Sequence, residues 1–176
     1  DFRILADGQI LPYQLKAAEC ENCELKELKD FQFSQIEQGV LVYLFELTFK
    51  PGINRISHSY SFPASSNVAF NQIYNYILTT GAKWAGGTIK DLTVNIDFGS
   101  NRYFYVNDIF GNNANWSIIG CGNVTSKKFF NVEDSSRMVR ILSGRLQIEA
   151  INFKPQKNIE FGIICENSFI SIPTDS

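Results

Sequence analysis

The clearest secondary-structure pattern in the chain is NRISHSYSF, at residues 54–62. Apolar or aromatic side chains occupy every second position: Ile56, His58, Tyr60 and Phe62. A period of two places alternate residues on opposite faces of a β-strand, whereas a helix would scatter them around its circumference. The stretch therefore predicts a strand with one apolar face.

Alternation of this kind recurs at short intervals, and clusters of Gly, Asn, Asp and Pro separate the runs. Asp7-Gly8 is a dipeptide typical of a tight hairpin, and Ser143-Gly144 predicts a second turn. Pro51-Gly52 is expected to reverse the chain, so that the strand at residues 54–62 returns beside the strand at residues 40–49. No helical pattern is long enough to connect parallel strands. The sequence therefore predicts an all-β fold, an antiparallel β-sandwich of about ten strands with little helix. Besides residues 54–62, strands are expected at residues 2–5, 10–15, 40–49, 68–79, 88–98, 102–107, 116–121, 137–142, 145–152 and 158–165.

The length of 176 residues and the 44% apolar content are typical of one globular domain. A chain of this size buries roughly 70% of its unfolded surface, so it needs no metal or disulfide to form a core. We expect a single β-sandwich domain over residues 1–176. Residues 1–38 are polar and have mixed periodicity, and they form either part of that domain or an N-terminal appendage of hairpin and loop.

Charge and hydropathy exclude two classes of partner. The 16 Lys and Arg residues nearly balance 18 Asp and Glu residues, and no stretch gathers five like charges. This balance argues against a nucleic-acid partner or an anionic membrane surface. The longest apolar run, Val40–Phe45, is far shorter than the roughly 20 residues of a membrane-spanning helix. The sequence therefore predicts no transmembrane segment and no nucleic-acid partner.

The four cysteines are Cys20, Cys23, Cys121 and Cys165. Cys20 and Cys23 could form a redox pair, half of a zinc site or a local disulfide. A zinc site needs a second close pair, and a thioredoxin-like site needs a βαβ unit, and the sequence offers neither. We favour a structural disulfide between Cys20 and Cys23, with no metal and no cofactor. Cys121 and Cys165 lie in apolar strands and are expected to be buried thiols.

Two features suggest the compartment of the protein. An even number of cysteines is compatible with an oxidising environment. The chain also starts at Asp1 without a Met, as a mature chain does after its signal peptide has been removed.

Nucleophilic catalysis would have to involve His58, the only histidine. This residue lies between Ile56 and Tyr60 on the apolar face of its predicted strand, and we interpret it as a core or interface residue. The sequence contains no Gly-x-Ser-x-Gly motif, so the usual setting of a hydrolase nucleophile is missing. We therefore predict no catalytic residues.

A carboxylate pair is the remaining route to hydrolysis. Asp91, Asp97, Glu149 and Glu160 lie on predicted strands, where each alternates with apolar neighbours and is expected on a solvated face. A glycosidase would need two of them roughly 5–10 Å apart in one cleft, with one pKa raised. A carboxylate-pair hydrolase stays as an alternative.

Aromatic side chains are the main candidates for ligand binding. The chain has 15 Phe, 7 Tyr and 2 Trp residues, and rings at the ends of strands can stack on sugars or anchor a partner protein. We expect partial exposure for Trp84, which is bracketed by glycines, for Tyr103 and Tyr105, and for Trp116 after an Asn-rich loop. Most other rings are expected in the core: Phe45, Phe49, Tyr60, Phe62, Tyr76 and Phe161.

The stretch from Thr48 to Phe98 combines FKPGINRISHSY at residues 49–60, YNYILTTG at 74–81, Trp84, and IKDLTVNID at 89–97. This combination resembles the β-rich extracytoplasmic region of uncharacterised secreted bacterial proteins, some of which carry a YARHG domain. The resemblance covers less than a third of the chain and brings no catalytic residues with it. It implies a secreted or periplasmic bacterial protein.

These observations lead to one functional expectation with two alternatives. We expect a non-catalytic binding or structural module located outside the cytoplasm, whose partner is an envelope protein or a glycan. The first alternative is a carbohydrate-binding module that uses loop aromatics. The second is the carboxylate-pair hydrolase, which two acidic side chains lining a common cleft would favour.

Overall fold

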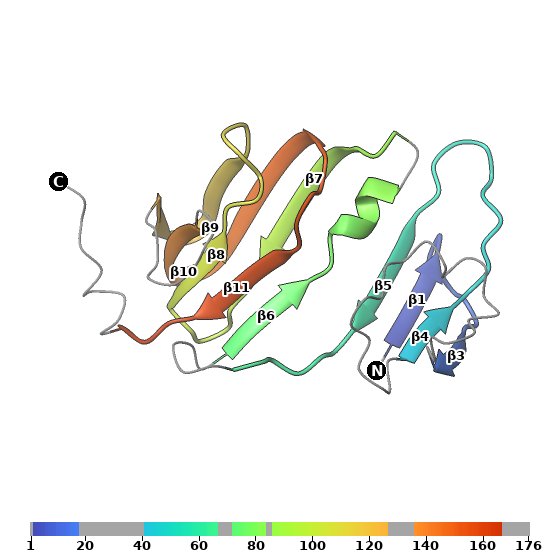
Figure 1. The fold of residues 1–176 in the computed structure, drawn as a ribbon, viewed down its shortest axis with the longest axis horizontal. Coiled ribbons are helices and arrows are strands. Elements are labelled where there is room, and N and C mark those ends of the chain that lie inside the picture. The colour runs from blue at the N-terminus through green and yellow to red at the C-terminus, as the bar shows by residue number, and fades with distance from the viewer. Residues whose placement is uncertain (1, 18–40, 67–71, 84–85, 127–135, 167–176) are drawn as a thin grey trace. The chain divides into compact units, whose positions relative to one another are not determined.

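The computed structural model describes residues 2–17, 41–66, 72–83, 86–126 and 136–166. The chain divides into two compact units, Asp1–Phe62 (unit 1) and Pro63–Ser176 (unit 2). The elements are β1 (Phe2–Ala6), β2 (Gln9–Ile10), β3 (Gln14–Ala17), β4 (Leu41–Leu44), β5 (Ile56–Tyr60), β6 (Gln72–Tyr76), the short 3₁₀ helix η2 (Thr79–Lys83), β7 (Ile89–Ile96), β8 (Tyr103–Asn107), β9 (Asn115–Ser126), β10 (Ser136–Phe153) and β11 (Ile159–Ile163) (Figure 1). All the strand pairs are antiparallel, so the all-β prediction is confirmed. The single-domain expectation stays a prediction, because a division into compact units does not test whether they fold together.

Unit 1 begins with the predicted hairpin. β1 and β2 pair through Ala6 and Gln9, which leaves Asp7 and Gly8 as the two turn residues. Both have positive φ, 48° at Asp7 and 83° at Gly8, as a type I′ turn requires. Asp-Gly meets this requirement because Gly has no Cβ and Asp tolerates left-handed backbone. The hairpin prediction is confirmed.

The rest of unit 1 consists of two small sheets. One has the strand order β2-β1-β5, and the other pairs β3 with β4. Aromatic rings connect them, because the Phe2 ring of β1 stacks on the Tyr43 ring of β4 at a centroid distance of 4.2 Å. The Tyr13 ring meets both at 5.2 Å, edge-on to Phe2. Ile4 on β1 is 1% exposed and is the one buried hydrophobic side chain among the described residues of this unit.

Unit 2 is built around β10, which is 18 residues long. The strand order is β6-β11-β8-β10-β7, and β9 pairs with β10 from Arg137 to Glu149. Because β9 occupies one edge of β10, β8 and β7 follow one another along its other edge. β10 thereby joins β7 to the group formed by β8, β11 and β6.

A β-bulge between Ile141 and Ser143 bends β10 near its middle. Next to it, Gly144 on β10 lies opposite Gly120 on β9. Gly144 has a φ of 88°, and a Cβ there would collide with the carbonyl oxygen of Ile119. A Cβ on Gly120 would likewise collide with the carbonyl oxygen of Ser143. Glycine at both positions therefore permits the close approach of the two backbones at the bend.

Side chains from both parts of β10 share one core with β7, β8 and β11. β7 contributes Ile96, and the most buried members of the core are Phe104, Val106, Val139, Leu146, Ile148 and Ile159. The Phe98 and Phe104 rings stack within it at a centroid distance of 3.3 Å. Residues before and after the bulge belong to this single cluster, so both parts of the bent strand contribute to one core. A second cluster of Tyr105, Met138 and Ile164 lies on the opposite face of β8.

Three details of the strand prediction were wrong. Ser143-Gly144 is not a turn, because β10 continues through it as a bulged strand. The strand expected at residues 40–49 ends at Leu44. β5 pairs with β1 and not with the strand that precedes it in sequence. These errors concern partners that are distant in sequence, which local alternation does not specify.

The expected core aromatics divide between the two units. Phe161 packs against the core of unit 2, as predicted. The other five, Phe45, Phe49, Tyr60, Phe62 and Tyr76, are exposed. Alternation shows which side chains share a face, but the coverage of that face depends on the rest of the fold. The core assignment of these five rings was therefore wrong.

Candidate functional site

Tyr103 and Tyr105, two predicted ligand-binding rings, lie on the same face of β8. Tyr103 is partly buried, and its hydroxyl donates a hydrogen bond of 2.6 Å to Glu166 Oε1. That hydrogen bond raises the pKa of Tyr103. Tyr105 is only 1% exposed, which corrects the expectation that a ligand could reach it. Burial, and then the 2.7 Å hydrogen bond from its hydroxyl to Glu160 Oε1, raise the pKa of Tyr105 well above its usual value.

Trp116 on β9 packs against the core of unit 2, edge-on to the Phe110 ring. The guanidinium of Arg137 lies 4.8 Å from the centre of the Trp116 ring, a cation–π distance. Arg137 Nε also donates a hydrogen bond of 2.8 Å to Asp108 Oδ2 within an ion pair. These contacts give the Trp116 ring a packing role inside unit 2. Trp84 lies outside the described residues.

The single histidine and the cysteines are placed as follows. His58 is exposed and stacks on Tyr60 at a centroid distance of 5.8 Å, so a place in the core was wrong, and its expected role as an interface residue stays a prediction. Cys121 on β9 and Cys165, which follows the end of β11, are both exposed and not buried as expected. The disulfide predicted between Cys20 and Cys23 falls outside the described residues. Among those residues, no group of three or more His, Cys, Asp or Glu side chains is placed to hold a metal ion.

Two of the four predicted carboxylates line one depression on the outer face of unit 2. Its volume is about 310 Å³, and Asp91 on β7 and Glu149 on β10 both contribute to it. The register pairs Asp91 with Ile151 and Thr93 with Glu149, so the two carboxylates are diagonal neighbours on the same face. Asn115 Nδ2 donates a hydrogen bond of 3.2 Å to Glu149 Oε2. The depression thus offers carboxylate, amide and hydroxyl groups to a ligand.

The other two carboxylates have local partners elsewhere. Glu160 accepts the hydroxyl of Tyr105, as described above. Asp97 Oδ1 accepts a hydrogen bond of 2.9 Å from the backbone N–H of Gly99 and thereby closes the turn after β7. The sequence identified all four as solvated strand residues, but their pairing depends on strand register.

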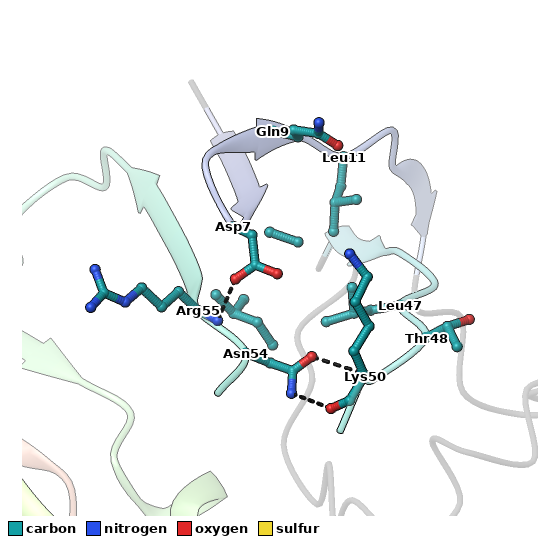
Figure 2. Close-up of a pocket in the computed structure, with 10 residues that line it drawn as sticks. Asp7, Gln9, Leu11, Leu47, Thr48, Lys50, Asn54 and Arg55 are labelled. Carbon is teal, nitrogen blue, oxygen red and sulfur yellow. Dashed lines mark hydrogen bonds between the residues drawn. The ribbon is translucent and has the colours of Figure 1, made fainter. Parts of the chain in front are cut away.

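Unit 1 contains a smaller pocket of about 220 Å³, which Figure 2 shows. The backbone N–H of Arg55 donates to Asp7 Oδ1 at 2.9 Å, which joins β5 to the hairpin turn. Asn54 closes the loop that follows residue 50, because it bonds both the N–H and the C=O of Lys50. The Lys50 side chain extends toward Leu11, whereas the Arg55 side chain points away from the pocket (Figure 2). The pocket therefore presents one ammonium group beside an apolar wall of Leu11 and Leu47.

The most distinctive surface of the described residues is the apolar surface of unit 1. Ten of the fifteen large hydrophobic side chains that are exposed lie in this unit. Ile53 is 86% exposed and Phe49 is 68% exposed. Exposed apolar surface that is concentrated in one region marks contact sites for proteins or membranes. This surface could not be recognised from the sequence, because the alternation that places Phe45, Phe49, Tyr60 and Phe62 on strands is also typical of core residues.

Comparisons with protein-family models, curated proteins and solved structures return no match for the chain. In the parts of the chain that the structure describes, no helix has the length and hydrophobicity needed to cross a membrane.

Proposed function

We propose that the chain is a non-catalytic binding or structural module of a secreted or envelope protein, and that it contacts another protein through unit 1. The observation that carries this proposal is the concentration of exposed apolar side chains in unit 1. The Tyr13, Tyr43, Phe45 and Phe49 side chains are among them. Rings of this kind supply much of the binding energy in protein interfaces, because they bury large areas at a low entropic cost.

The energetics of unit 1 support the same proposal. Its described residues bury one hydrophobic side chain, Ile4, whereas those of unit 2 bury the sixteen others. Burying apolar surface contributes about 25 cal/mol per Å², so covering exposed side chains such as Phe49 and Ile53 would stabilise a complex. The location outside the cytoplasm is part of the proposal and rests on the sequence patterns alone.

Photo-crosslinking from unit 1 tests this function in the organism that produces the protein. We expect a benzoyl-phenylalanine at position 53 to form a discrete adduct in the envelope or extracellular fraction. The matched control carries the same group in place of Ile151, which is 73% exposed but belongs to unit 2. Mass spectrometry of each adduct identifies the protein that is captured.

Competition by untagged chain shows whether the adduct at position 53 reports a specific contact. Untagged wild-type chain should suppress the adduct at position 53, and the Phe49→Ser variant should need about ten times more protein for the same effect. Phe49 is exposed, so its replacement should leave the melting temperature nearly unchanged. The absence of an adduct at position 53, or equal adducts at positions 53 and 151, would contradict the proposal.

Sugar binding at the depression of unit 2 is a second candidate function. The specific observation that favours it is the joint contribution of Asp91 and Glu149 to one depression, together with Thr93 and Asn115. Ionised carboxylates accept hydrogen bonds from sugar hydroxyls, and amides both donate and accept them. The lining side chains of Asp91, Thr93, Asn115 and Glu149 are exposed, so a polysaccharide could reach them.

Affinity electrophoresis in gels that contain soluble polysaccharides tests this second function. We expect at least one polysaccharide to retard the wild-type chain, and Glu149→Gln to weaken that retardation about tenfold. Asp97→Asn is the control. Asp97 directly follows β7, the strand that contains Asp91, but it accepts a hydrogen bond from the Gly99 N–H and does not line the depression. If the wild-type chain releases reducing sugar from a polysaccharide and Glu149→Gln does not, the chain is a carboxylate-pair hydrolase instead. Unretarded migration in every gel would exclude sugar binding of useful affinity.

A further inference from the structure

The backbone of β5 has one edge that no described strand covers. β5 is the last strand in the order β2-β1-β5. The N–H of Asp7 donates to the C=O of Arg55 at 2.8 Å, so the backbone groups of Arg55 point toward β1. Successive residues of an antiparallel strand point their backbone groups to opposite sides. Ile56 and His58 therefore direct their N–H and C=O groups away from β1, toward the open edge.

Within the described residues, this edge carries no charge, proline or bulge of the kind that normally prevents strands from pairing with other chains. Natural edge strands are protected by charged residues, by proline, by bulges or by being very short. Residues 56–62 contain no Lys, Arg, Asp, Glu or Pro. The other edge of the same sheet is protected, because β2 has only two residues and Pro12 follows shortly after it. The two edges of one sheet thus differ sharply in their capacity to accept a further strand.

The side-chain pattern of β5 is symmetric about its central residue. Its sequence is ISHSY, with a serine on either side of His58 and a large apolar or aromatic residue at each end. A two-fold axis through His58 would place Ser57 opposite Ser59 of a second copy, and Ile56 opposite Tyr60. All the large side chains would then lie on one face of the joined sheet, and all the serines on the other. Arg55 would lie opposite Ser61, so the pairing opposes no like charges.

We propose that unit 1 forms a two-fold dimer in which the β5 edges of two copies pair antiparallel about His58. Pairing at a strand edge is a common mode of protein recognition, in which backbone hydrogen bonds supply affinity. An interface that matches itself under a two-fold axis is the usual basis of homodimers. This inference rests on the proposed function and names a second copy of the chain as the partner of unit 1.

The size of β5 limits the strength of the dimer. A ladder of five residues lies at the small end of specific interfaces, which corresponds to weak association. We expect a dissociation constant on the order of 10 to 100 μM. Joining two copies would produce a six-stranded sheet from two sheets of three strands, with the protected β2 strands at its outer ends.

Analytical ultracentrifugation of the full chain from 5 to 500 μM tests the dimer. We expect His58→Lys to weaken dimerisation at least tenfold, because it places two ammonium groups opposite each other across the axis. His58→Pro should do the same by removing a backbone donor that points away from β1. Ile10→Lys on the protected edge is the control and should dimerise like the wild type. Residue-resolved hydrogen exchange should show slower exchange of the Ile56 and His58 amides at high concentration.

The outcomes distinguish a dimer of the chain from binding of unit 1 to a different partner and from no binding through unit 1. A chain that stays monomeric at 500 μM would overturn the dimer, as would dimerisation that survives His58→Lys in a protein with an unchanged circular dichroism spectrum. If His58→Pro fails to fold, His58→Lys and the exchange data are sufficient. A monomeric chain that still forms the adduct at position 53 would leave the proposed function standing with a different partner. A monomeric chain without that adduct would remove both.

Discussion

Gly144→Ala should lower the melting temperature of the chain by about 6–12 °C. Gly144 has a φ of 88°, and an added Cβ would collide with the carbonyl oxygen of Ile119 on the paired strand. Positive φ in a residue with a side chain costs of order 1–3 kcal/mol, and the collision adds backbone displacement at the bend. We expect a total loss of about 3 kcal/mol, at 2–4 °C per kcal/mol for a chain of this size. Thermal unfolding followed by circular dichroism measures the effect.

Gly111→Ala separates the cost of positive φ from the cost of the collision between the added Cβ and the paired strand. Gly111 also has positive φ, 71°, but an added Cβ would meet nothing within 4 Å. It should therefore cost about 1 kcal/mol, or 2–4 °C, from backbone conformation alone. Equal losses in the two variants would mean that the close approach of β9 and β10 does not limit the residue at position 144.

Phe104→Ala should destabilise unit 2 by about 3–5 kcal/mol, the usual range for a buried phenylalanine. The Phe104 side chain is 0% exposed and stacks on Phe98 in the shared core. Truncating its ring removes contacts and leaves a cavity that the paired strands on both sides of β8 cannot close. Urea unfolding should show a lower midpoint with an unchanged slope.

Two further substitutions control this measurement. Phe104→Leu keeps most of the apolar volume and should cost about half as much. Ile151→Ala removes an exposed side chain from β10 and should change the unfolding free energy by less than about 0.5 kcal/mol. A Phe104→Ala variant as stable as Ile151→Ala would place Phe104 outside the core.

Local chemistry in the sequence was sufficient to predict several elements. Asp7-Gly8 specified its hairpin, because few other dipeptides accept positive φ at both turn positions. The strands expected at residues 88–98 and 102–107 correspond to β7, where apolar and polar residues alternate from Asp91 to Ile96, and to β8, a short run rich in aromatic residues. Each of these features depends on neighbours within a few residues of one another.

Features that depend on distant residues could not be predicted in this way. Ser143-Gly144 has the composition of a turn, and only the pairing of Gly144 with Gly120 on β9 makes it part of a bulged strand. The side chains of His58 and Tyr60 share a face of β5, as expected, but both are exposed. The four strand carboxylates could be named individually from the sequence, whereas the diagonal proximity of Asp91 and Glu149 depends on the register of β7 against β10.

Because β7 and β8 follow one another along a single edge of β10, the connection between them should tolerate cleavage and insertion. The connection between them spans residues 97–102, and Gly99, Ser100 and Asn101 within it are exposed. A protease that cut there would leave the two fragments associated, because β7 of the first fragment pairs with β10 of the second, and β6 pairs with β11. The same connection is where an inserted peptide tag or a circular permutation would disturb the hydrophobic interior least.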